Sequence, residues 1–233
     1  MTDSELRKKA AETAARLRDE TVPDEEIISR IEEEPELVHA ACLSGANLFL
    51  EAVVSNRFPI AQALREMGAD IHWTCKASVF NGNALNAART PQQAEQLLEW
   101  GVEIERNLSL LIDKPFKNPA IMAAFHNDTA MLLYWLKKQE ELFPDELEYV
   151  GEIFYAAINV VSMMNQYHML SCVIADDKLF EILKEIYSLE DDIESIRLSL
   201  SALRHIKDDG LAVRKQELRK ILNTKKKKLS STT

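Results

Sequence analysis

Apolar residues recur at helical spacing along most of this chain, and few residues interrupt the pattern. The segment NLFLEAVVSNRFPIAQALREMG (47–68) holds two amphipathic runs that are separated by Asn56 and Arg57. Residues three and four positions apart lie on one side of a helix, so each run predicts a helix with one apolar face. The 233 residues include only 6 Gly and 7 Pro. We therefore predict an all-α fold.

The helical pattern repeats along the chain. The segment EQLLEWGVEIE (95–105) has the same shape as QALREMGADIH (62–72), and Gly101 lies 33 residues after Gly68. A third copy of the pattern begins at Asn118. Gly after a helical run is typical of a helix end, where the backbone adopts a left-handed conformation. A period near 33 residues indicates stacked structural repeats.

Several short motifs carry a resemblance to a known family. Gly-Ala-Asp-Ile-His at 68–72 resembles the Gly-Ala-Asp-Val-Asn pattern of ankyrin repeats, and Ala-Leu-Asn-Ala-Ala at 84–88 resembles their Pro-Leu-His-Ala-Ala pattern. Asn-Pro at 118–119 stands where these repeats usually have Thr-Pro. The chain thus resembles a divergent ankyrin-repeat protein, most clearly over 47–142. Two departures are a shorter first helix in the second copy and Gln139 in place of the third Gly.

This resemblance implies an all-α, ankyrin-like helical repeat solenoid with helical caps at both ends. We expect an N-terminal helical cap over 1–46 and about three repeats over 47–145. The region 146–207 is a C-terminal helical region, either with a degraded fourth repeat or as a separate cap. The region 208–233 is expected to be a basic, disordered tail, although Leu211–Leu222 also fits a short helix.

Charge is unevenly distributed along the chain. The formal net charge is −10, whereas the part from Leu211 onward carries eight Lys or Arg and one Glu. An acidic body disfavours nucleic-acid binding by the body itself. The Lys225–Lys228 run is interpreted as a solvated tail. The alternatives are contact with nucleic acid or an anionic membrane, and a sorting or secretion signal.

Targeting signals and cysteine spacing bear on the location. No apolar run approaches the length of about 18 residues that a membrane span needs, and the first residues lack a secretory signal pattern. Cys42, Cys75 and Cys172 are far apart and form no CxxC motif. These features predict a reducing, cytoplasmic location. Some bacterial proteins with the suggested architecture are translocated effectors, which leaves transfer into a host cell as an alternative.

Motifs for catalysis are missing from the sequence. There is no GxSxG, HExxH, Gly-rich phosphate loop or EF-hand loop, and none of the five His is spaced with another His or Cys as metal ligands are. We therefore expect a non-enzymatic protein without a metal or cofactor. The alternative is a secreted effector or regulatory enzyme with a site in 150–206, near Tyr155 and His168.

The resemblance implies an adaptor or inhibitor that binds a partner protein through its fingers and concave face. An exposed Trp is a strong candidate anchor, because aromatic residues dominate interface energies. For Trp73 the alternative is packing against the neighbouring finger or Phe80. The implied finger residues are His72, Trp73, Lys76, Glu103 and Arg106, and the implied first-helix residues are Glu51, Val54, Ser55, Met122, Phe125 and His126.

Overall fold

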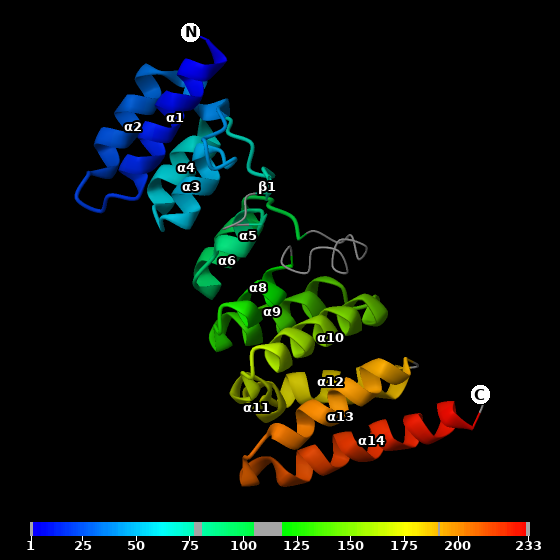
Figure 1. Cartoon of the computed structure of the whole chain (residues 1–233). Helices are drawn as coiled ribbons and strands as arrows, with labels where there is room; N and C mark the ends of the chain where they lie inside the picture. The colour runs from blue at the N-terminus through cyan, green and yellow to red at the C-terminus, as the bar shows by residue number, and fades with distance from the viewer. Residues whose placement is uncertain (1, 77–80, 105–117, 191, 232–233) are drawn as a thin grey trace. The chain divides into compact units, whose positions relative to one another are not determined.

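The computed structural model describes residues 2–76, 81–104, 118–190 and 192–231 (Figure 1). Helices make up most of these residues, which confirms the all-α prediction, and the strands among them are two of two residues each. The chain divides into two compact units, residues 1–105 (unit 1) and 106–233 (unit 2). The division falls inside the segment 47–145 that we had assigned to one set of repeats.

Unit 1 consists of short helices and one small hairpin. Its first helices pack on the pair formed by α3 and α4, and α5 follows beside α3 (Figure 1). The strands pair antiparallel, with Cys75 opposite Gly82. The elements are α1 (Asp3–Leu17), α2 (Asp24–Glu33), η1 (Pro35–His39), α3 (Leu48–Val54), α4 (Phe58–Glu66), β1 (Cys75–Lys76), β2 (Asn81–Gly82), α5 (Ala84–Ala87) and α6 (Pro91–Glu99).

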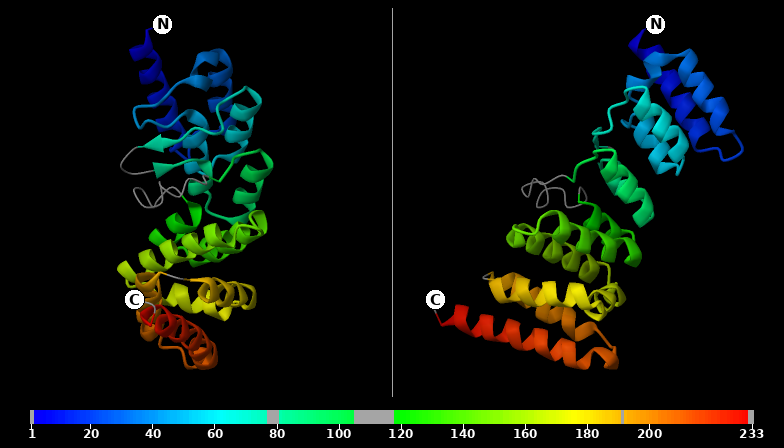
Figure 2. Two further views of the ribbon diagram at one scale, coloured as in Figure 1. Left: turned by 90° about the vertical axis from the view of Figure 1, so that its right-hand side faces the viewer. Right: turned by 180° about the vertical axis from the view of Figure 1, so that it is seen from behind.

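Unit 2 is built from longer helices that lie in successive layers. Figure 2 shows α8 and α9 next to α10, then α11 and α12, and finally α13 with α14. Its core includes the fully buried side chains of Trp135, Phe154 and Tyr187. The elements are α8 (Pro119–Phe125), α9 (Thr129–Leu142), α10 (Leu147–Met163), α11 (Tyr167–Ala175), α12 (Asp177–Leu189), α13 (Ile193–His205), η3 (Asp209–Leu211) and α14 (Ala212–Ser230).

The same turn joins the helices of three pairs. Asn56, Asn127 and Asn165 follow α3, α8 and α10 with φ of 59°, 59° and 56°. The amide of the next residue donates to the carbonyl five residues earlier, at 2.8, 2.9 and 2.9 Å. Helices often end with one residue in this left-handed conformation. Gly is the most common residue there, and Asn also occurs. The Asn residues therefore set the tight reversal within each pair.

In unit 1, Gly has the left-handed conformation at the end of the second helix of each pair. Gly68 and Gly101 follow α4 and α6 with φ of +90° and +92°, and a Cβ at either position would meet no other atom within 4 Å. The backbone conformation, and not the space available, therefore requires Gly at both positions. The helix ends that the sequence predicted at these two residues are confirmed.

The first helices of these pairs begin at Asn residues that make two kinds of bond. The Oδ1 atoms of Asn47 and Asn83 accept hydrogen bonds from amides in the first turns of α3 and α5. Their side-chain amides donate to the carbonyls of Asp70 and Glu103, at 2.7 and 2.8 Å. Both acceptors lie two residues after the helix-ending Gly. Each Asn thus ties the start of its helix pair to the end of the same pair.

The third copy replaces this arrangement. Helix α9 continues through Gln139, where the earlier copies have Gly. Gln139 and Asn118 are both fully buried, and the Gln139 Nε2 donates to the Asn118 Oδ1 at 3.4 Å. A side-chain amide therefore meets the Asn in this copy, whereas the first two copies present a backbone carbonyl. Helix α5 is also short, as the sequence indicated, with four residues against seven in α3.

The expected disordered tail over 208–233 is wrong for the residues described. Helix α14 runs to Ser230, and its Leu218 and Leu222 are fully buried against α12 and α13. The Arg214 guanidinium donates to two carbonyls at the end of α11, at 2.8 and 2.9 Å. These packing contacts stabilise helix α14, although its polar composition suggested a disordered segment.

Candidate functional site

Two hairpins project from the helices of unit 1. In hairpin A (residues 41–47), Ala41 bridges to Asn47, and the Cys42 amide donates to the Ala46 carbonyl at 2.7 Å. Hairpin B is formed by β1 and β2 (residues 75–82), of which 77–80 are not described. Hairpin B follows Gly68, where the repeat pattern predicted a finger, whereas hairpin A was not predicted. Most of the finger predicted after Gly101 lies outside the described residues.

The two hairpins are bonded to one another. The Trp73 Nε1–H donates to the Gly45 carbonyl at 2.8 Å, and the Cys75 thiol donates to the Ser44 carbonyl at 3.5 Å. The polar atom of Trp73 is thus used within the protein, in agreement with the alternative of packing against a neighbouring hairpin. Phe80, the other partner considered, lies outside the described residues. Trp73 is half-buried and supports the hairpins more than it offers a separate anchor.

Exposed side chains remain around this junction. Leu43 at the tip of hairpin A is 79% exposed, and His72 and Thr74 are exposed on either side of Trp73. The His72 amide is fixed by a 2.9 Å hydrogen bond to the Asp70 carboxylate. We call Leu43, His72 and Thr74 the hairpin surface. The sequence indicated His72, but it did not indicate Leu43.

Glu51 was expected to face a partner, and this expectation is wrong. Its side chain is only 3% exposed. Both carboxylate oxygens accept from the Arg18 Nη2 at 2.7 Å, and one accepts from the Ser44 hydroxyl at 2.6 Å. Glu51 lies where the end of α1 and hairpin A meet α3, so it joins these elements together.

The other predicted first-helix and finger residues of unit 1 differ in exposure. Val54 and Ser55 are half-buried at the end of α3, and the Val54 carbonyl accepts from Arg89 at 2.9 Å. Glu103 is exposed, as expected. The Lys76 backbone pairs in β1, but its side chain lies outside the described residues.

In unit 2, the predicted residues of α8 separate into core and surface. Met122 is 6% exposed and belongs to the core, so its expected role in binding is wrong. Phe125 is 40% exposed and His126 is exposed, and their rings meet edge to face at 5.4 Å. Arg106 lies outside the described residues.

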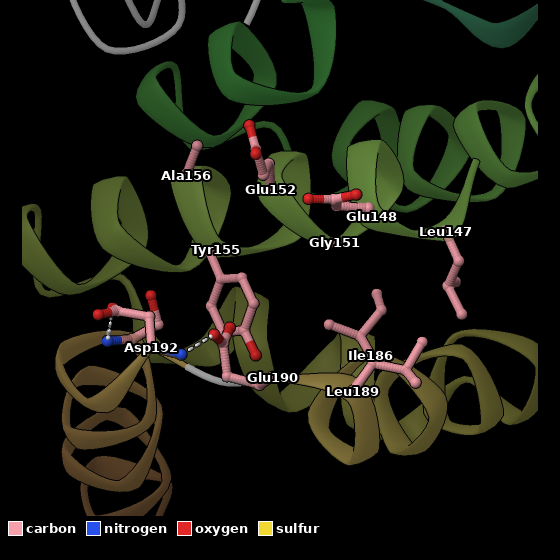
Figure 3. A pocket seen from close by; sticks show the side chains of 11 residues that line it. Leu147, Glu148, Gly151, Glu152, Tyr155, Ala156, Ile186, Leu189, Glu190 and Asp192 are labelled. Atoms are coloured by element: carbon pink, nitrogen blue, oxygen red, sulfur yellow. Dashed lines mark hydrogen bonds between the residues drawn. The ribbon is translucent and has the colours of Figure 1, made fainter. Parts of the chain in front are cut away.

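Unit 2 also contains a groove that the sequence analysis did not identify. It encloses about 850 Å³ between α10 on one side and the end of α12 with the start of α13 on the other (Figure 3). Ligand sites in proteins commonly have volumes of this order. The groove is lined by Leu147, Glu148, Gly151, Glu152, Tyr155, Ala156, Ile186, Leu189, Glu190, Asp192 and Ser195.

The charge of the groove has one sign. Four lining residues carry carboxylates, and none of the described lining residues is Lys, Arg or His. Burial, with a contribution from Glu148, raises the pKa of Glu152. Hydrogen bonds from Ser195 lower the pKa of Asp192, which caps the start of α13. At neutral pH the groove therefore presents an acidic surface.

One signal for the groove was present in the sequence. Glu148, Gly151, Glu152 and Tyr155 fall on one side of α10, at helical spacing, in a helix that is otherwise strongly apolar. The opposite wall lies more than thirty residues away in sequence, so only the folded structure brings the two together.

The enzyme alternative required Tyr155 and His168 to meet in one pocket, and the structure separates them. Tyr155 lines the acidic groove, whereas His168 lines a different, open cleft with Tyr167 and His205, whose rings stack at 4.6 Å. Within the described ranges, no group of three His, Cys, Asp or Glu is placed to hold a metal ion. In the same ranges, no helix is long and apolar enough to cross a membrane.

Comparison with known proteins gives no match. No protein-family model matches this chain, and no curated protein matches it in sequence.

Proposed function

We propose that this chain is an ankyrin-type repeat protein that acts as a non-enzymatic binding module for a partner protein. The recurrent Asn-to-carbonyl bonds of Asn47 and Asn83 support the repeat architecture, because each closes a helix pair in the same way. Hairpin B, which precedes Asn83, supports it too, since the resemblance implies a finger after Gly68.

The hairpin surface is the proposed contact with the partner. The observation that carries this proposal is Leu43, a large apolar side chain that is 79% exposed on a hairpin fixed by the Trp73 indole. An apolar anchor held in one conformation loses little entropy on binding. His72 and Thr74 supply polar groups beside the anchor. The partner would therefore offer an apolar pocket with a polar rim.

An adaptor or inhibitor needs no reacting group, only a rigid surface and a partner. Its action would consist in holding the partner or covering the partner's own site. We also propose a cytoplasmic location, which is supported by the cysteines Cys42, Cys75 and Cys172, none of which forms a disulfide in the described part of the chain.

A photocrosslinking experiment tests this proposal. Leu43→benzoylphenylalanine would be compared with Val213→benzoylphenylalanine, because Val213 on α14 is 77% exposed and gives a matched control. We expect a discrete crosslinked partner from position 43 that is missing from position 213. Excess unlabelled wild type should suppress the crosslink, whereas excess Leu43→Ser/His72→Ala should suppress it at least tenfold less well.

Circular dichroism of the competitor shows whether it retains its fold. If the folded double variant competes as well as the wild type, the hairpin surface is not the contact. If position 43 gives no crosslink above that from position 213, the proposed role of the hairpins is likewise wrong.

A further inference from the structure

The acidic groove of unit 2 combines apolar and negatively charged walls. Leu189, at the end of α12, is 63% exposed, although it lies beside the buried Ile186 (Figure 3). Gly151 on α10 faces Ile186, and a Cβ at this position would approach the Ile186 Cγ2 to 3.4 Å. The glycine thus leaves the floor of the groove open and apolar.

Carboxylates line both sides of this floor. Glu148 and Glu152 lie one turn apart on α10, and Glu190 and Asp192 lie across the groove (Figure 3). Backbone bonds fix the second pair: the Ser195 amide donates to the Asp192 carboxylate and the Asp192 amide to the Glu190 carboxylate, both at 2.7 Å. The negative charge is therefore held in place and does not rest on mobile side chains alone.

These carboxylates differ from acids on the helices that pack around them. Elsewhere around α12 the acids are paired with lysines, as Lys178 with Glu140 at 2.8 Å and Lys184 with Glu217 at 3.1 Å. In the described part of the chain, Glu148 and Glu152 form no ion pair. Like charges one helical turn apart repel each other. A cation brought by a ligand would relieve this repulsion.

Tyr155 lies in the groove beside Glu190 (Figure 3). Burial, with a smaller contribution from a hydrogen bond with the Glu190 side chain, raises the pKa of Tyr155, so the phenol stays protonated. The phenol therefore adds a neutral polar group to the groove and leaves its negative charge unchanged.

We propose that this groove binds a lysine- or arginine-rich peptide segment of a partner protein, with an apolar side chain of the segment placed on Leu189 and Leu147. Charge complementarity selects the basic residues, and the apolar floor distinguishes a peptide from a simple cation. The volume of about 850 Å³ accommodates several side chains. This inference deepens the proposed binding function and rests on it, but it concerns a surface separate from the hairpins.

The test uses the full chain and two fluorescein-labelled peptides, GKKLLKKLG and its acidic counterpart GEELLEELG. We expect the basic peptide to bind and the acidic one not to bind, as measured by fluorescence anisotropy. Glu148→Gln/Glu152→Gln should weaken binding at least tenfold, and Leu189→Ser about threefold. The matched controls are Glu32→Gln/Glu36→Gln on the exposed part of unit 1, and Leu43→Ser, both of which should bind like the wild type.

Several results would overturn the inference. One is unchanged binding in Glu148→Gln/Glu152→Gln with preserved circular dichroism. Another is equal displacement by spermidine together with no effect of Leu189→Ser, which would show that only charge is recognised. A third is dimerisation in sedimentation velocity that the groove variant abolishes, because the occupant would then be a second copy of this chain.

The outcome for the groove is distinguishable from that for the hairpins. If the Leu43 crosslink is found and the peptide test fails, the proposed function stands and the groove assignment falls. If the peptide binds through the groove and the Leu43 crosslink is missing, the chain binds protein segments but not through its hairpins.

Discussion

The side-chain amide of Asn47 donates a 2.7 Å hydrogen bond to the backbone carbonyl of Asp70, and this bond joins the start of the first helix pair to its end. The Asn47 Oδ1 accepts from the Leu50 amide at 2.9 Å as the helix cap. One buried residue therefore serves two backbone segments that are 23 residues apart. Asn83 repeats the arrangement with Glu103.

Substitution of Asn47 should separate these two contributions. Asn47→Ala loses both the cap and the buried bond, and we expect a loss of about 2 kcal/mol in the free energy of unfolding. Asn47→Ser retains an acceptor for the cap but no amide donor, so it should recover about half of that loss. Urea denaturation measures both values. Equal stability of Asn47→Ser and the wild type would show that the bond to Asp70 contributes nothing.

Removal of Arg18 should destabilise the protein because the Glu51 carboxylate would remain buried. For Arg18→Met we expect a loss of about 1 kcal/mol, at the low end for a buried ion pair, since Arg18 itself is 56% exposed. The double variant Arg18→Met/Glu51→Met should lose less than the sum of the two single variants. Additive losses in chemical denaturation would contradict a direct interaction between the two side chains.

Cys42 should resist alkylation in the folded protein. Burial, with a contribution from Glu51, raises the pKa of its thiol to about 12, so the reactive thiolate is scarce at about pH 8. Cys172 is half-buried and should react with N-ethylmaleimide first. Peptide mass spectrometry locates the label, and labelling in concentrated guanidinium chloride gives the unfolded control. Similar native rates at the two cysteines would contradict the buried position of Cys42.

Peptide binding in the groove should weaken as the pH falls. The pKa of Glu152 is raised, so this carboxylate takes up a proton at a higher pH than an ordinary Glu does. The other titratable groups of the groove are Glu148, Tyr155, Glu190 and Asp192, of which Glu148 contributes to this raised pKa. The lowered pKa of Asp192 keeps that residue charged. As the pH falls, the groove therefore loses negative charge first at Glu152.

The same raised pKa acts on stability in the opposite direction. Folding favours the protonated form of Glu152, so its contribution to the free energy of unfolding rises as the pH falls through the folded-state pKa. Anisotropy titrations of GKKLLKKLG at about pH 7 and pH 5 measure the change in binding. Glu152→Gln should flatten this dependence; a variant that keeps the full pH dependence would exclude Glu152 as its source.

Local turn chemistry made part of the fold predictable from the sequence. Gly68 and Gly101 end helices where the repeat pattern placed such ends, and the Asn residues between helices have a backbone preference of their own. The role of Glu51 was not predictable in this way. Its burial depends on Arg18, which lies 33 residues earlier, and on Ser44 in hairpin A.

The candidate sites show the same limit. His72 could be predicted as exposed because it follows a helix-ending Gly, whereas the hydrogen bond of Trp73 depends on the neighbouring hairpin. The acidic groove arises only when α10 meets α12 and α13, so no local pattern shows both of its walls. Composition was a poor guide at the C-terminus, where the burial of Leu218 and Leu222 stabilises a helix despite the surrounding lysines.

The helical state of Lys225–Lys228 changes how this basic run can act. A helix turns by about 100° per residue, so four consecutive side chains point in four directions around its axis. A flexible chain could turn all four ammonium groups toward one row of phosphates, but a helix presents only part of them at a time. The charges of the run are therefore distributed around the helix, and only part of them can contact one row of phosphates while this turn stays helical.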